Sequence, residues 1–239
     1  MLVILTAAVT PHPDFAVALS DPSTRSAQYR LTAAKWGEIA DNVGGKLVII
    51  ETTGADPQQV LPRGSCAELV AYSPQPDDIK RGKGAVEARA LDDYLEHAAM
   101  PPETTFYKCT GRIWIHNAPR LVQPLKVGEI AIRRRIDGLW ADTRFFGTTL
   151  EVWRRHLTGM ADQVYDDEDV HLEHVMARRL LLGLGHDELK VRRLPAHPEW
   201  EGMSGTSGVA YRTRRTSLGS RIRNGLEDEM SRRVGRWTL

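Results

Sequence analysis

The sequence predicts an α/β protein with a mainly parallel central sheet, and three observations support this prediction. Residues 2–8 form a continuous apolar run, which is typical of a strand covered on both faces. Apolar stretches of this kind then alternate with amphipathic stretches through the first half of the chain. The resulting order, β-α-β-β-α-β, favours parallel strands that are joined by helical crossovers in an α/β sandwich.

Local signals place each element of the first half. Asp21-Pro22 suits an N-cap and first helical residue, and Tyr29 and Trp36 then mark the apolar face of a helix. A loop rich in Pro, Asp and Gly covers 73–84 and leads into a second amphipathic helix that Pro101-Pro102 ends. The predicted strands of this half are residues 2–8, 46–51 and 67–72, followed by 106–117 (FYKCTGRIWIHN), which reads as two short strands interrupted at Thr110-Gly111.

The second half is more mixed. Strands are predicted at 129–132 and 139–146, and Thr148–Glu151 has the pattern of a capping box that begins a helix. Four consecutive acids begin a further helix at 166–184, and a mobile loop is predicted at 201–220. We therefore expect a catalytic domain at 1–185 and a basic C-terminal extension at 186–239, packed on that domain or tethered to it.

Composition limits the function. Lys plus Arg (32) nearly balances Asp plus Glu (31), so no global field indicates a nucleic-acid partner. Two cysteines do not form a disulfide framework, and the apolar N-terminus is too short to span a bilayer, so a cytoplasmic location is expected. Residues 211–239 carry eight Arg against three acids, with apolar residues spaced as on one helical face. This pattern suits peripheral contact with the inner membrane face, a partner protein, or packing on the protein's own domain.

Candidate ligand-binding residues fall where predicted strands end or helices begin, which is where open α/β sheets bind ligands. The Arg81–Gly84 segment (RGKG) precedes a helix, so its backbone N–H groups and Lys83 suit an anion, although the Walker spacing is absent. The alternative for this segment is a flexible surface turn. The predicted set for a diphosphate and its attached groups is Arg25, Glu51, Asp56, Lys83, Lys108, Arg112 and Arg144.

Three carboxylates are candidates for acid–base chemistry. Asp142 to Arg144 are predicted to end the strand LWADTRFF, where Asp142 suits a metal ligand or a base, although an Asp–Arg pair two residues apart is often structural. Glu168 and Asp169 lie among four acids, where a carboxylate can take a proton from an attacking hydroxyl. The alternative is that these acids only complement a helix dipole.

Three motifs resemble a group of bacterial proteins associated with capsule and lipopolysaccharide gene sets. They are GKGxxE at 82–87, KxTGR at 108–112 and DTRFF at 142–146, and the resemblance covers roughly residues 2–180. Members of that group look like GT-A-type glycosyltransferases, which implies a nucleotide-sugar donor and a glycan or lipid-linked acceptor. It also implies Mg or Mn held by an Asp-x-Asp motif. That motif is missing here, and Lys108 and Arg112 stand near where it is expected, so cations in place of a metal are a second interpretation.

Two other functions remain open from the sequence. A sugar nucleotidyltransferase typically has a Gly-rich loop directly after its first strand, whereas this chain has TPHPDFAVALSDPSTR there. A non-catalytic scaffold of an envelope-assembly complex would use the basic C-terminus and would not need cations at strand ends. Serine hydrolase and dinucleotide-binding functions have little support, because neither GxSxG nor GxGxxG is present.

Overall fold

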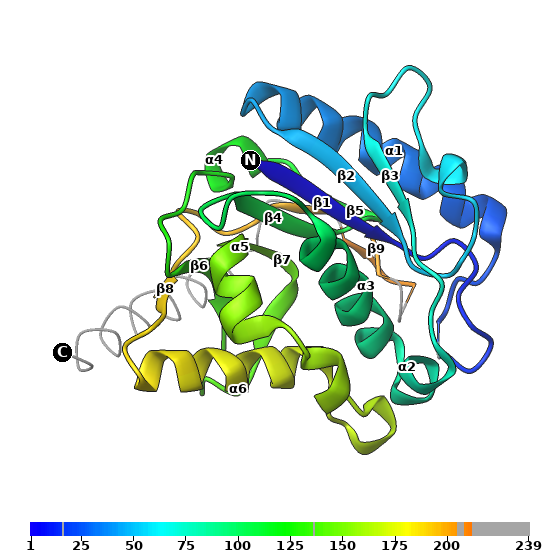
Figure 1. Cartoon of the computed structure of the whole chain (residues 1–239). Coiled ribbons are helices and arrows are strands. Elements are labelled where there is room, and N and C mark those ends of the chain that lie inside the picture. The colour runs from blue at the N-terminus through cyan, green and yellow to red at the C-terminus, as the bar shows by residue number, and fades with distance from the viewer. Residues whose placement is uncertain (16, 136, 205–207, 212–239) are drawn as a thin grey trace, which may run out of the picture.

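The computed structural model describes residues 1–15, 17–135, 137–204 and 208–211, and its centre is a mixed β-sheet (Figure 1). Among these residues seven strands lie side by side in the order β3-β2-β1-β4-β7-β6-β8. Only β7 runs antiparallel to its neighbours, while the other pairs are parallel. Their bounds are β1 Leu2–Ala7, β2 Lys46–Glu51, β3 Glu68–Ala71, β4 Thr105–Thr110, β6 Glu129–Arg134, β7 Ala141–Thr149 and β8 Lys190–Arg192.

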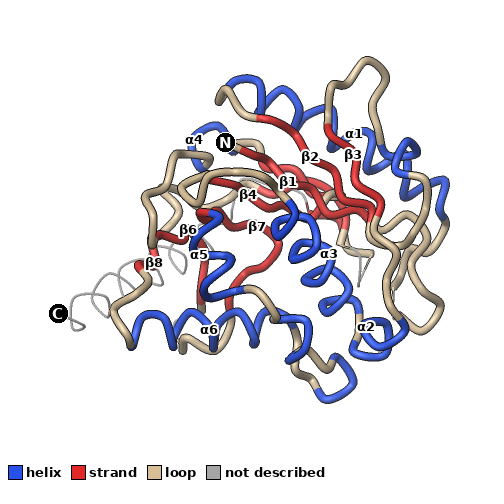
Figure 2. Tube along the Cα trace, in the orientation of Figure 1, coloured by secondary structure: helices blue, strands red, loops and turns tan. Residues whose placement is uncertain are grey.

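Helices cover both faces of this sheet (Figure 2), which confirms the predicted α/β sandwich with a mainly parallel mixed sheet. On one face α1 (Pro22–Asn42) and α4 (Ala118–Leu121) pack on Val3 and Leu5 of β1. On the other, Ile4 belongs to a core formed with α3 (Lys83–His97), α5 (Leu150–Val152) and α6 (Leu172–Gly185). Because successive strand residues face opposite cores, residues 2–5 of β1 are all apolar.

The stretch FYKCTGRIWIHN does form two strands, but they belong to different sheets. β4 lies in the central sheet, whereas β5 (Ile113–Ile115) pairs with β9 (Trp200–Met203), which pairs in turn with β10 (Ala210–Tyr211). The prediction of a mobile loop at 201–220 was therefore wrong for the residues in β9 and β10. Residues 205–207 and 212–239, with the predicted basic helical face, lie outside the described residues.

Several predicted boundaries in the second half were wrong, and each has a local cause. Asp166–Glu168 form a separate 3-10 turn (η4), after which Asp169 adopts a left-handed conformation with φ 57°, so the four acids do not begin α6. The helix expected after Thr148 begins at α5 with Thr149 as its cap, because β7 continues through Thr149. A π-helical segment, η2 (Trp153–Leu157), follows α5.

Short helical turns complete the structure. Residues expected to be loop form α2 (Pro76–Arg81), because Pro76 suits a first helical turn and Gly82, with φ 113°, lets the chain turn directly into α3. The 3-10 turns η1 (Pro57–Val60) and η3 (Met160–Gln163) lie at other connections. No described helix combines the length and the apolar character that a membrane crossing requires.

Candidate functional site

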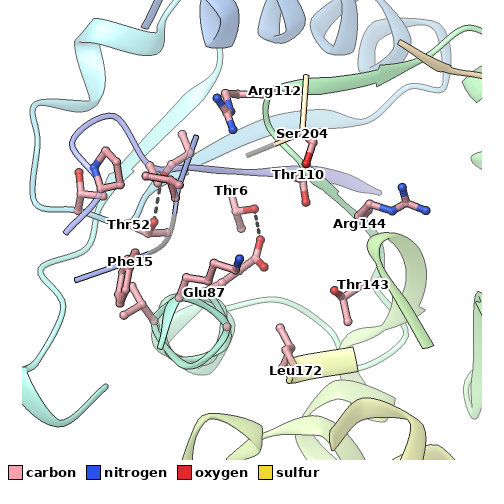
Figure 3. Close-up of a pocket in the computed structure, with 18 of the residues that line it drawn as sticks. Thr6, Phe15, Thr52, Glu87, Thr110, Arg112, Thr143, Arg144, Leu172 and Ser204 are labelled. Carbon is pink, nitrogen blue, oxygen red and sulfur yellow. Dashed lines mark hydrogen bonds between the residues drawn. The ribbon is translucent and has the colours of Figure 1, made fainter. Parts of the chain in front are cut away.

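A cavity of about 610 Å³ opens at the carboxyl end of the parallel strands (Figure 3). Thr6 near the end of β1 and Thr110 at the end of β4 reach it, as the general rule for open α/β sheets leads us to expect. β7 reaches the same edge with its first residues rather than its last, because it runs in the opposite direction. Asp142 and Arg144 therefore line the cavity from the beginning of β7, and the prediction that they end a strand was wrong.

One side of the cavity is apolar. Phe15, from the segment after β1, packs against the core that includes Val86 of α3 and Leu172 at the beginning of α6, as does Ile79 of α2, and all four line the cavity. Such a surface suits the flat, weakly polar part of a ligand, while polar groups at the strand ends fix the ligand's orientation.

Four of the predicted cations line the cavity, namely Arg25, Lys83, Arg112 and Arg144. Arg112 lies in the turn between β4 and β5, is only 3% exposed, and donates one hydrogen bond, from Nη1 to Gln28 Oε1 at 3.3 Å. Burial lowers the pKa of the Arg112 guanidinium, while the neighbouring Tyr29 raises it and Arg25 lowers it. Burial therefore disfavours a positive charge that the chain nevertheless places there.

Arg25 is buried as well, at 3% exposed, and its donors are used within the protein. Nε donates to Ala8 O at 2.5 Å, Nη1 to Leu19 O at 2.8 Å and Nη2 to Tyr29 Oη at 3.2 Å. No carboxylate among the described residues forms an ion pair with Arg25 or with Arg112. The two buried cations thus leave uncompensated positive charge beside the cavity.

Lys108 does not line the cavity, and it is 1% exposed. Its Nζ is 2.7 Å from Glu87 Oε1, and it also donates to Thr143 O at 2.9 Å and Thr110 Oγ1 at 3.4 Å. The acidic partner, Glu87, is the last residue of the GKGxxE motif but is not among the predicted site residues. It lies on the same helical face as Lys83, four residues earlier, and that spacing is the signal that could have indicated it.

Two predicted acids near β2 have structural contacts instead. Glu51 is fully buried, and its carboxylate accepts hydrogen bonds from the backbone N–H groups of Val9, Thr53 and Ala55, each at 2.9 Å. It thereby holds together the turns that follow β1 and β2. Asp56 caps η1 through Gln58 N at 2.9 Å. Neither carboxylate lines the cavity, so each acts on the site only by shaping the chain beside it.

Asp142 and Arg144 form a two-point ion pair at the cavity wall, with Nε–Oδ1 and Nη2–Oδ2 distances of 2.8 and 2.7 Å. Burial opposes the charge on Arg144, but its hydrogen bonds to Asp142 outweigh burial and raise its pKa. The Arg144 guanidinium also lies over the rings of Trp200 and Tyr211, at 4.7 and 5.4 Å. The Asp142–Arg144 pair has no net charge. Trp200 of β9 and Tyr211 of β10, in the three-stranded sheet, hold its guanidinium in place.

The described side chains do not fit a divalent metal site. Nowhere in the described ranges do three His, Cys, Asp or Glu side chains converge as metal ligands would. Asp142, the predicted metal ligand, uses both of its oxygens for Arg144, and Arg133 Nη1 lies 3.8 Å from one of them. An Mg or Mn site would need several free oxygen ligands.

The predicted bases Glu168 and Asp169 do not line the cavity, but the first acid of their cluster does. Asp166 Oδ1 is 3.0 Å from His171 Nδ1, and both residues line the wall beside α6. The ring of Trp140, also at this wall, packs edge-on against His171 at 6.3 Å. Sequence spacing cannot show which of four neighbouring acids faces inward, because the left-handed turn at Asp169 redirects the chain.

Comparison with known proteins gives fold-level similarity alone. No family model matches the sequence, and no curated protein sequence matches it. Among solved structures, a protein of Desulfovibrio desulfuricans G20 described as a nucleotide-diphospho-sugar transferase is 10% identical, with a TM-score of 0.48 over 81% of this chain and 78% of that one. The apo-form glycosyltransferase GlyE of Streptococcus pneumoniae TIGR4 is also 10% identical, with a TM-score of 0.45 over 80% of this chain but only 44% of that one. Neither score is high enough to assign a family.

Proposed function

We propose that the protein is a glycosyltransferase that moves a sugar from a nucleotide-diphosphate donor to a hydroxyl acceptor. The observation that carries the proposal is the pair of buried cations, Arg25 and Arg112, which no described carboxylate neutralises. Burying an unpaired charge costs free energy, and a bound anion recovers part of that cost. The cavity therefore favours a ligand with concentrated negative charge.

The dimensions and lining of the cavity support a ligand larger than phosphate alone. Its volume of about 610 Å³ is typical of small-molecule sites. One side is apolar, around Phe15, and suits a nucleobase, while Arg112 lines the cavity where its guanidinium can meet a diphosphate. Hydroxyl groups of Thr6 and Thr110 add polar contacts at the strand ends.

The proposed reaction forms a bond between the acceptor oxygen and the anomeric carbon and breaks the bond from that carbon to the diphosphate. The electron pair leaves with the diphosphate, whose growing charge Arg112 and its neighbour Arg25 stabilise electrostatically. The acceptor proton passes to a base at the cavity wall. His171, oriented by Asp166 through its Nδ1, is better placed for this role than Glu168 or Asp169, since those two do not line the cavity.

Asp142 is a weaker candidate base, because Arg144 engages both of its oxygens. We derive no step through Mg or Mn, since the described donors do not fit a metal. The acceptor and the cellular location are proposed from the resemblance of the three sequence motifs. We propose a hydroxyl of a surface glycan or lipid-linked sugar as acceptor, and a cytoplasmic location with peripheral contact at the inner membrane face. The residues that would make such contact lie beyond Tyr211, outside the described residues.

Thermal-shift measurements test the proposal directly. The protein is heated with UDP-glucose, GDP-mannose, dTDP-glucose and a CMP-sugar, each with Mn²⁺ and with EDTA. A diphosphate site stabilises the folded state by mass action, so at 100 times Kd we expect about 2.7 kcal/mol and a rise in Tm of several degrees. A sugar nucleotidyltransferase also binds nucleotide sugars, as its products, but would respond in addition to a nucleoside triphosphate together with a sugar 1-phosphate. The absence of any shift at millimolar donor would contradict the enzyme proposal and favour the scaffold.

A further inference from the structure

Glu87 extends from α3 toward the centre of the cavity, where its carboxylate is held through one oxygen only (Figure 3). Thr6 Oγ1 donates to Oε1 at 2.5 Å, and Lys108 Nζ lies 2.7 Å from the same atom. The second oxygen, Oε2, accepts no hydrogen bond from any residue that the structure describes. The Glu87 side chain is 24% exposed, so a ligand in the cavity can reach it, whereas Lys108 is almost completely covered.

Lys108 fixes this carboxylate rather than binding a ligand itself. The Nζ of Lys108 donates hydrogen bonds to Thr143 O and Thr110 Oγ1 and forms an ion pair with Glu87 Oε1. Lys108 is thus engaged within the protein, and it does not line the cavity where a phosphate would bind. A buried ion pair contributes little stability relative to a well-packed apolar pair. What the Glu87–Lys108 pair does provide is an ionised carboxylate with a fixed direction.

The free oxygen selects the kind of ligand group that it meets. An ionised carboxylate accepts hydrogen bonds and repels phosphate, so its partner has to be a donor such as a hydroxyl. Figure 3 shows Arg112 on the opposite side of the cavity from Glu87. The Thr110 and Thr143 side chains lie on the side of the cavity where Arg144 is drawn. A ligand with its diphosphate near Arg112 would thus place an adjoining polyhydroxyl group beside Glu87.

We propose that Glu87 Oε2 accepts a hydrogen bond from a hydroxyl of the transferred sugar, with Lys108 as its positioning residue. This inference rests on the proposed function, because it presumes a donor that carries a sugar on a diphosphate. It assigns the sugar to the α3 side of the cavity and makes Glu87 the group that distinguishes a nucleotide sugar from the bare nucleotide diphosphate.

Calorimetric titration of matched ligand pairs tests the inference. The pairs are UDP-glucose with UDP, GDP-mannose with GDP, and dTDP-glucose with dTDP. The substitution Glu87→Gln keeps the shape of the side chain and an acceptor for Thr6 but removes the charge. We expect it to weaken binding of the sugar nucleotide at least tenfold while the affinity for the nucleotide diphosphate changes less than twofold.

Two further variants separate recognition from folding. Glu87→Gln leaves Lys108 without its charged partner, so the double variant Glu87→Gln/Lys108→Met restores a neutral interior and should show the same loss of sugar preference. Glu68→Gln breaks a Glu–Lys pair outside the cavity, with the exposed Lys46 at 2.6 Å, and should change neither affinity.

Several outcomes would overturn the inference. One is that Glu87→Gln weakens the affinity for the sugar nucleotide and for the nucleotide diphosphate equally. Another is that it changes neither affinity. A third is a wild-type protein that binds the sugar nucleotide no more tightly than the nucleotide diphosphate. An equal loss would place Glu87 at the nucleotide instead. A wild-type protein that binds no ligand of any pair would contradict the proposed function itself, and that result differs from every outcome that concerns Glu87 alone.

Discussion

Replacing Arg112 by Met should weaken donor binding strongly while leaving the unliganded fold as stable as before. A hydrogen bond to a charged group contributes about 1.5–3 kcal/mol. Two such contacts from one guanidinium to a diphosphate, partly offset by lost hydration, amount to about 2–4 kcal/mol. We therefore expect a loss of affinity between about 30-fold and 1,000-fold. The loss should be shared by the sugar nucleotide and the nucleotide diphosphate, unlike the selective loss expected for Glu87→Gln.

The expected effect on stability has a different sign from that of an ordinary core substitution. Arg112 is 3% exposed and donates one hydrogen bond, to Gln28, and burial lowers its pKa. Met retains most of the apolar stem and removes a charge that no described carboxylate compensates. The free energy of unfolding without ligand should stay within about 0.5 kcal/mol of the wild-type value or rise above it.

Urea denaturation at 25 °C and calorimetric titration with the donor measure the two quantities on the same protein. Arg120→Met, an exposed arginine outside the cavity, is the matched control and should change neither. If Arg112→Met lost 2 kcal/mol or more of stability but bound the donor normally, Arg112 would be a structural residue. The argument from uncompensated charge would then be refuted.

Three further predictions concern the fold that carries the site. Burial raises the pKa of Asp92 to about 6, so its protonated form stabilises the fold fully below about pH 4, and this contribution is lost as the pH rises toward 6. Relative to Asp92→Asn, the wild type should lose about 2–3 kcal/mol of unfolding free energy between pH 4 and pH 7, measured by urea denaturation. Arg89→Met leaves the buried Asp78 without its ion pair at 3.3 Å and should cost about 2–3 kcal/mol in the same assay, since Arg89 is partly exposed. Gly147→Ala would place a Cβ 2.3 Å from the Tyr107 ring and should lower Tm by an amount equivalent to about 2–3 kcal/mol.

Each of these predictions has a control in the same chain. Asp93→Asn, next to Asp92 but exposed, should show no comparable dependence on pH, and an equal pH dependence in both variants would contradict the assignment to burial. Arg178→Met, at an exposed position of α6, should change stability by less than about 0.5 kcal/mol. Gly185→Ala has open space around its Cβ, so it should be tolerated; equal costs at Gly147 and Gly185 would rule out the steric explanation.

The parallel half of the fold was predictable because its signals are local. A strand covered on both faces is mostly apolar, as 47–50 is within the predicted strand 46–51, and the structure has β2 at 46–51. The direction of β7 and the separation of β5 from β4 were not predictable in this way. β5 pairs with β9, which lies more than 80 residues later in the chain, and no periodicity records such a partner. The direction of β7 and the pairing of β5 therefore depend on long-range contacts that a local sequence pattern does not show.

The candidate site also has one feature that local patterns predict and one that depends on long-range pairing. Cations at strand ends could be predicted, because the carboxyl edge of a parallel sheet is a general place for ligands, and Lys83 and Arg112 do line the cavity. Which cations are already neutralised could not be predicted. Lys108 is paired with Glu87, 21 positions earlier and on another element, so the sequence overstates the number of charges free for a diphosphate.

The distribution of charge gives the proposed ligand a direction. The Glu87–Lys108 pair and the Asp142–Arg144 pair are each neutral within themselves, so neither attracts a diphosphate at long range. Positive potential is left on the α1 side, around Arg112. A donor would therefore enter with its diphosphate toward α1 and its sugar toward α3, and the wall formed by β7 and α6 would face the acceptor. If a metal bound this diphosphate, replacing Arg112 would change the donor affinity only slightly when Mn²⁺ is present. The Arg112→Met titration, repeated with Mn²⁺ and with EDTA, separates these cases, because cation-only binding requires the same large loss of affinity under both conditions.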